Sequence, residues 1–285
     1  MTKISYVNGK YLNFKRANIS INDRSMHFSD AAYEVVAVYN RRLVFWKEHV
    51  NRLKKSLALL EINNFDNINY LFLKCNEIIE LNSLKFGLIY IHVSRGVASR
   101  NHNWDFNLKP SLVISAIHKD VFKKNKPISL ISNKDIRWKY SNIKSTSLLG
   151  NVLLKQKALK KNSFECIMYD DKKMITEATT SNVWIIKNKK LFTPPLKKNI
   201  LPGVTRKIIF QIARKLNISA IEKEFNLKSL VLSDGVFLTN SSSLLLLANK
   251  IDNLKIKTDK DNISKLIFNK LIDLIKKNDS EEFAR

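Results

Sequence analysis

Glycine is scarce in this sequence, and the few glycines stand apart from one another. The 285 residues contain six glycines, and neither GxGxxG nor GxxxxGK[ST] occurs. Both motifs need clustered glycines, because the backbone must come close to the phosphates of a nucleotide. The sequence therefore argues against a Rossmann or P-loop nucleotide site.

Cysteines, histidines and long apolar runs are also few. Cys75 and Cys166 match no metal or redox spacing, and the five histidines form neither HxxxH nor HExxH. We therefore predict two reduced thiols and no metal site. No signal-peptide pattern opens the sequence, and the densest apolar cluster, LLLLA at 244–248, is much shorter than the ~20 residues of a membrane-spanning helix. We expect a soluble cytoplasmic protein with no membrane partner.

Positive charge is in large excess. The chain has 39 lysines and 11 arginines against 25 acidic residues, which gives a net charge of +25. A nucleic-acid partner is one interpretation of such a charge. However, the lysines are spread along the chain, and arginine, the better reader of phosphates and bases, is the minority. With 31 asparagines as well, this indicates a general drift of composition. We expect no nucleic-acid partner and keep a non-catalytic basic binding protein as a distant alternative.

Strand and helix patterns alternate in the N-terminal half. ISYVNGKYLNF predicts a hairpin that turns at Asn8-Gly9, and YEVVAVYNRRLVFW predicts a second that turns near Asn40-Arg41. Apolar residues at helical spacing predict a helix in KEHVNRLKKSLALLEI, and INYLFLKCNEIIELN is expected to form the next one. KFGLIYIHVSRG and PSLVISAIHK are typical of core strands.

The C-terminal half mixes both kinds of element. ECIMYDDKKMITEATTSNVWIIKNKKLFTPP predicts strands joined by short turns, and GVFLTNSSS predicts a strand that ends in hydroxyls. Helices are predicted at 147–161 and in GVTRKIIFQIARKLN and NISKLIFNKLIDLIKKND. We therefore expect a mixed α/β (α+β) protein of two domains. The smaller N-terminal α/β domain would span 1–120, a connection 121–135, and a larger C-terminal domain of strands and helices 136–285.

Hydroxyl side chains gather at three element junctions of the C-terminal half: TTSN at 179–182, PGVT at 202–205 and NSSS at 240–243. Free N–H groups at the start of a helix, with hydroxyls nearby, bind a phosphate without a glycine loop. Each cluster alone is also typical of caps and turns. Together, in the same half as Lys144, they suggest a single phosphate-binding cup.

Seven segments of the chain form an ordered pattern: FSDAAYEVVAVYN, EHVNRL, SRGVASRNH, DIRWKYSNIKSTSLLGNVLLKQKA, TEATTSNVW, ILPGVTR and FLTNSSS. In this order the sequence resembles the class IV, fold-type IV aminotransferases, which use pyridoxal 5′-phosphate. The resemblance runs over nearly the whole chain and is most specific in the lysine segment and in TE-x-x-x-SN. Within that superfamily it looks closest to the D-amino acid aminotransferases.

The resemblance implies that Lys144 binds the cofactor covalently and moves the proton at the substrate α-carbon. Such a lysine must be partly unprotonated, which burial favours. Glu177 would pair with the pyridine nitrogen of the cofactor, so that the ring withdraws charge from the α-carbon. Arg52 would meet the phosphate as a charge-assisted fork. The other implied cofactor contacts are Ser181, Asn182, Val204, Thr205 and Ser241.

On the substrate side, Tyr33, Arg100 and His102 match the carboxylate trap of D-amino acid aminotransferases. The resemblance implies that Arg100 and His102 come from a neighbouring subunit, so we expect a homodimer. The position of this grip decides which hand of amino acid presents its α-hydrogen to the lysine. A D-amino acid and a 2-oxo acid are therefore the predicted substrates. A branched-chain L-amino acid aminotransferase and an aminodeoxychorismate lyase are the alternatives.

Two positions depart from the family pattern. Ala31 stands where the family usually has glycine before the entry tyrosine, which affects strand packing near the substrate. After TNSSS the chain continues LLLLANKID, without the glutamate and proline that are common there. Both changes concern the shape of the pocket and hence the preferred side chain, and neither involves Lys144 or Glu177.

Overall fold

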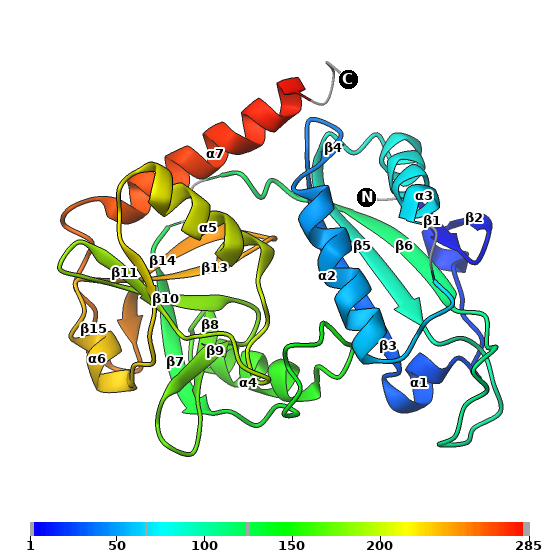
Figure 1. Ribbon diagram of the computed structural model, residues 1–285, viewed down its shortest axis with the longest axis horizontal. Helices are drawn as coiled ribbons and strands as arrows, with labels where there is room; N and C mark the ends of the chain where they lie inside the picture. The colour runs from blue at the N-terminus through cyan, green and yellow to red at the C-terminus, as the bar shows by residue number, and fades with distance from the viewer. Residues whose placement is uncertain (1–2, 66–67, 124–125, 282–285) are drawn as a thin grey trace. The chain divides into compact units, whose positions relative to one another are not determined.

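The computed structural model describes residues 3–65, 68–123 and 126–281 (Figure 1). Its contacts divide the chain into two units. Described residues of the first unit lie within Met1–Val121, Ile143–Ser147 and Asn278–Arg285, and those of the second within Phe122–Asn142 and Leu148–Lys277. Lys144 therefore groups with the first unit, although the chain on both sides of 143–147 groups with the second.

The first unit is built on a six-stranded sheet with the order β2-β1-β6-β5-β3-β4. Its strands are β1 (Ile4–Val7), β2 (Lys10–Asn13), β3 (Ala31–Tyr39), β4 (Arg42–Leu43), β5 (Phe86–Ser94) and β6 (Ser111–His118). Neighbouring strands run antiparallel, and both predicted hairpins are present. Asn8, Asn40 and Arg41 have positive φ angles of 47°, 49° and 67°, as the tight turns of hairpins require. The hairpin predictions are confirmed.

Two long helices pack on this sheet and form its core. They are α2 (Trp46–Leu59), which packs on β3, and α3 (Ile68–Leu81), which packs on β6. Leu53 and Ile78 of these helices are buried with Val36 and Ile91 of the sheet. The apolar spacing seen in the sequence thus predicted both helices correctly. Two shorter helices, η1 (Phe14–Arg16) and α1 (Arg24–Phe28), join β2 to β3 and were not predicted.

The second unit is built on a nine-stranded sheet with the order β12-β11-β10-β13-β14-β7-β8-β9, and β15 pairs with β14. The strands are β7 (Ile128–Lys134), β8 (Glu165–Tyr169), β9 (Ile175–Ala178), β10 (Asn182–Lys187), β11 (Lys190–Thr193), β12 (Ala220–Glu222), β13 (Gly235–Asn240), β14 (Leu244–Ile251) and β15 (Leu254–Lys255). The helices are α4 (Leu149–Lys160), α5 (Val204–Lys215), α6 (Leu227–Val231) and α7 (Ile263–Glu281). α4 packs on β7 and β8, and α5 packs on β12 and β13.

Apolar residues of the second unit fill the core around the sheet. The LLLLA cluster forms most of β14, where Leu246 and Ala248 are buried in the core. None of the helices in the described residues is long and apolar enough to cross a membrane. The segment 121–135, predicted as the connection, contains β7, which pairs with β8 and β14. Its residues 124–125 lie outside the described ranges, and the domain boundaries remain predictions.

Candidate active site

Lys144 lies on an extended segment beside β3. Its carbonyl accepts a hydrogen bond from the Tyr33 N–H at 2.9 Å, and its own N–H donates to Ser56 Oγ of α2 at 3.1 Å. The Lys144 Nζ lies 4.1 Å from the centre of the Tyr33 ring. Backbone contacts to a strand and a helix thus hold the amine over the ring of a predicted substrate residue.

A buried ion pair and a histidine lie on the other face of β3. Arg52 donates from Nε to Glu34 Oε1 at 2.7 Å and from Nη2 to Glu34 Oε2 at 2.8 Å, and His49 Nδ1 lies 2.8 Å from Oε2. Burial alone would raise the pKa of Glu34, but Arg52 and His49 outweigh it and hold that pKa well below its usual value. Burial lowers the pKa of His49. Arg52, the predicted phosphate ligand, is thus fixed in orientation by a charged carboxylate.

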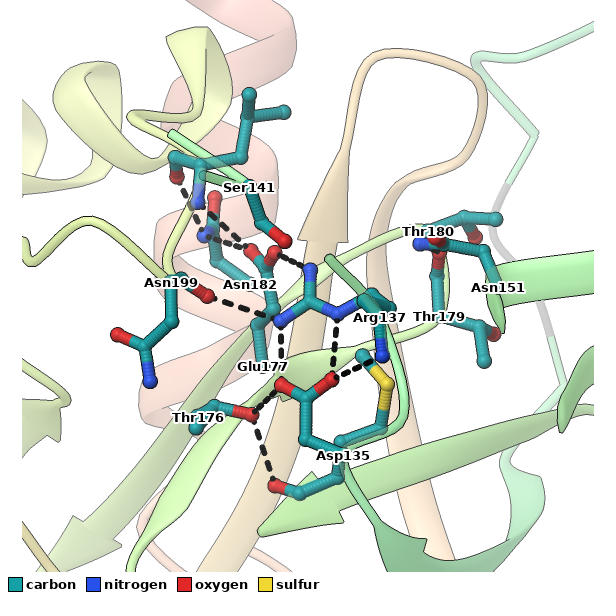
Figure 2. A network of polar contacts seen from close by, with 12 residues as sticks. Asp135, Arg137, Ser141, Asn151, Thr176, Glu177, Thr179, Thr180, Asn182 and Asn199 are labelled. Carbon is teal, nitrogen blue, oxygen red and sulfur yellow. Dashed lines mark hydrogen bonds and ion pairs between the residues drawn. The ribbon is translucent and has the colours of Figure 1, made fainter. Parts of the chain in front are cut away.

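Glu177 stands on β9, at the centre of a buried polar network (Figure 2). Its carboxylate accepts hydrogen bonds from Arg137 Nη1, from Asn182 Nδ2 at 3.3 Å and from the Leu201 N–H at 3.1 Å. The two predicted residues Glu177 and Asn182 are therefore in direct contact. Arg137 is a partner that the sequence did not assign.

Arg137 is itself held on three sides (Figure 2). It donates to the Asp135 carboxylate from Nε at 3.0 Å and from Nη2 at 2.7 Å, and to the Asn199 carbonyl at 2.9 Å. Thr176 Oγ1 donates to Asp135 Oδ2 at 2.8 Å. The guanidinium thus stands between two carboxylates, and its fork geometry suits both of them.

The network sets the charge of its carboxylates in opposite directions. Burial raises the pKa of Glu177 to about 7, and Arg137 opposes that rise. Burial also acts to raise the pKa of Asp135, but the hydrogen bonds from Arg137 prevail and hold it below its usual value. Arg137 has a raised pKa, because its two carboxylate neighbours outweigh its burial. Glu177 is therefore the member whose ionisation responds to a further cationic partner near neutral pH.

The start of α5 packs tightly against the Glu177 network. Asn182 Nδ2 also donates to the Leu201 carbonyl at 3.0 Å. A Cβ placed on Gly203 would lie 2.0 Å from Asn182 Oδ1, so only glycine permits this approach. Val204 and Thr205 follow in the buried first turn, where no side chain caps the helix. First-turn N–H groups have no acceptor within the helix, so this end can receive an anion.

The other two hydroxyl clusters meet beside Asn182. Ser181 Oγ donates to Glu165 Oε2 at 3.0 Å and accepts from Asn240 Nδ2 at 2.8 Å. Ser241 begins the turn between β13 and β14. The three hydroxyl clusters are thus neighbours in the second unit. Glu165 was not predicted as part of the site, because it reads as an ordinary strand residue and its partners are 14 to 16 positions away.

Arg100 and His102 lie on an exposed loop that joins β5 to β6 in the first unit. The Arg100 guanidinium lies 5.6 Å from the centre of the Phe28 ring, and the His102 ring lies 5.4 Å from the same ring. Both predicted trap residues therefore flank one aromatic side chain of α1. Their role toward a substrate remains a prediction, as do the roles of the other site residues.

Comparison with known proteins places this geometry in a family. The family described as amino-transferase class IV matches residues 31–251. The D-alanine aminotransferase of Bacillus licheniformis is 32% identical over 247 residues, which cover 86% of this chain and 87% of that protein.

Solved structures show the same fold. The branched-chain amino acid aminotransferase of Escherichia coli has a TM-score of 0.90 at 21% identity and covers 96% of this chain and 95% of its own. Another branched-chain amino acid aminotransferase, from T.th. and with pyridoxamine 5′-phosphate, has a TM-score of 0.88 at 18% identity, covering 96% and 94%. The chain belongs to the class IV aminotransferases, a family that depends on pyridoxal phosphate. The predicted fold class is confirmed.

Proposed function

We propose that this protein is a D-amino acid transaminase that uses pyridoxal 5′-phosphate and exchanges the amino group of a D-amino acid with a 2-oxo acid in a ping-pong cycle. The observation that carries the proposal is the buried Glu177 carboxylate, paired with Arg137 and joined through Asn182 to the start of α5. The relatives named D-alanine aminotransferase support the choice of substrate class.

The residues present fit pyridoxal phosphate. A buried acid suits a pyridinium nitrogen, and the close approach of Asn182 and Gly203 leaves the first turn of α5 for a phosphate. Val204, Thr205 and Ser241 would hold that phosphate, with Arg52 as its cation and Ser181 beside the ring. When bound, the cofactor supplies an electron-withdrawing ring.

The chemical work of the chain falls to a few side chains. Lys144 would hold the cofactor and move the proton at the α-carbon of the substrate. Glu177, backed by Arg137, would keep the proton on the ring nitrogen. Tyr33 with Arg100 and His102 would grip the α-carboxylate and orient the α-hydrogen toward the lysine.

The proposal includes a homodimer whose second subunit supplies the Arg100 loop. An exposed apolar face on α4 supports it, since Leu149, Val152 and Leu153 are 72%, 58% and 54% exposed. Light scattering of the purified protein measures the mass directly. A fully active monomer would contradict this part of the proposal. A cytoplasmic location is supported by the two free, buried thiols of Cys75 and Cys166, which a reducing compartment preserves.

The visible spectrum tests the function. We expect the purified protein to carry the cofactor absorption and to lose it on titration with D-alanine but not with L-leucine. Loss with L-leucine alone would refute the D-specific proposal and favour the branched-chain alternative. Lys144→Ala should remove the covalently bound cofactor. A colourless wild-type protein that binds nucleic acid in a salt-sensitive way would support the non-catalytic alternative instead.

A further inference from the structure

The loop that carries Arg100 and His102 has no regular secondary structure and is largely exposed. Three consecutive carbonyls of this loop nevertheless converge on one side chain. Arg24 donates from Nη1 to the carbonyls of Asn101 at 2.6 Å and Asn103 at 3.2 Å, and from Nη2 to that of His102 at 3.2 Å. A single guanidinium therefore fixes the backbone on both sides of His102.

Arg24 is itself immobilised. It is 3% exposed, and its Nε donates to Asp30 Oδ2 at 2.8 Å. Asp30 also accepts two bonds from Arg95, at 2.7 Å and 3.0 Å. The Arg24 N–H donates to the Gly96 carbonyl at 2.9 Å, at the point where the loop leaves β5. The cation is thus anchored to the scaffold at both its backbone and its side chain.

Phe28, at the other end of the same short helix, contacts the side chains of the loop. Its ring lies near the guanidinium of Arg100, the ring of His102 and, at 4.7 Å, the guanidinium of Arg24. α1 therefore contacts the loop twice, with Arg24 on the backbone and Phe28 on the two trap side chains.

We propose that Arg24 and Phe28 are positioning residues that set the direction of Arg100 and His102 and thereby the affinity for the substrate α-carboxylate. This inference rests on the proposed transaminase function. Neither residue needs to touch the substrate. Arg24 fixes where the loop backbone runs, and Phe28 limits the rotamers of the two side chains that grip the carboxylate.

The test compares Arg24→Lys and Phe28→Leu with wild type. Lysine keeps the charge but has no fork to reach three carbonyls. Amide hydrogen exchange in residues 100–104 should become faster in Arg24→Lys, while β5 and β6 keep their protection. The KM for D-alanine should rise about tenfold or more in both variants, with kcat within about threefold and the cofactor absorption unchanged.

Arg95→Lys is the matched control. Arg95 shares Asp30 and is similarly buried, but its backbone acceptors are Leu60 and Glu61 at the end of α2. We expect a similar loss of thermal stability with a much smaller change in KM. An equal rise of KM in Arg95→Lys, or faster loop exchange with unchanged KM in Arg24→Lys, would overturn the proposal. A wild-type protein that reacts with neither D- nor L-amino acids would refute the transaminase function itself, and the exchange experiment would still report whether Arg24 orders the loop.

Discussion

Arg137 offers the sharpest test of the buried network, because it is the cation between two carboxylates. Its side chain is 4% exposed, and those of Asp135 and Glu177 are 12% and 6% exposed. Arg137→Gln would leave both acids buried without their counter-charge. Removing one partner of a buried pair costs about 3–5 kcal/mol, far more than the net worth of the pair. In a unit of this size the midpoint of thermal unfolding should fall by on the order of 10 °C.

The loss should depend on pH in a defined direction. In the wild-type protein the lowered pKa of Asp135 contributes stability that is present above the usual aspartate pKa and lost in acid. Glu177, with its pKa raised to about 7, contributes stability that is present in acid and lost as the pH rises through 7. Arg137→Gln should raise the pKa of both acids. The deficit in unfolding free energy should therefore be smallest near pH 4 and grow toward pH 8.

Denaturant unfolding of the cofactor-free protein at several pH values measures this deficit. Arg41→Gln is the control, because the Arg41–Glu80 pair is 53% and 60% exposed and should be worth less than about 1 kcal/mol. A deficit for Arg137→Gln that is as small as that of the control at pH 8, or that does not change with pH, would refute this account of the network.

Three further changes test the proposed roles of predicted residues. Glu177→Gln should retain the cofactor but slow the half-reaction with D-alanine by about 10²-fold or more, and an unchanged single-turnover rate would exclude Glu177 as the ring partner. Arg100→Ala should raise the KM for the amino acid, and unaltered steady-state kinetics would remove Arg100 from the site. Gly203→Ala would place a Cβ 2.0 Å from Asn182 Oδ1, so equilibrium titration should show weaker binding of pyridoxal phosphate, by about tenfold. Unchanged affinity would show that the start of α5 does not hold the phosphate.

Local signals in the sequence predicted those parts of the fold that local physics decides. The Asn-Gly pair at 8–9 has the φ preferences of a tight turn, and the apolar spacing of α2 and α5 needs no distant partner. β14 was not predicted as a strand, because a run of leucines is equally compatible with a buried helix. β7 was assigned to a connection, because its two parallel partners are supplied by segments about 35 and 120 residues further along.

The candidate site was predictable only where a motif carries it. Lys144 and Glu177 follow from segment patterns, but the Arg137–Glu177 contact joins residues 40 positions apart, and nothing local distinguishes Arg137 from other arginines. Arg24 is a stronger case, since its acceptors are 77 to 79 positions away and are backbone carbonyls, which have no sequence signature.

Asn182 gives the second unit a mechanical property that its separate contacts do not suggest. One amide donates to Glu177 and to the Leu201 carbonyl, and its oxygen lies against Gly203. A displacement of the helix start would therefore be transmitted to the acid within a single side chain. In thermodynamic terms, the ring and the phosphate of a bound cofactor would be coupled, and its affinity would not divide into independent contributions from its two ends.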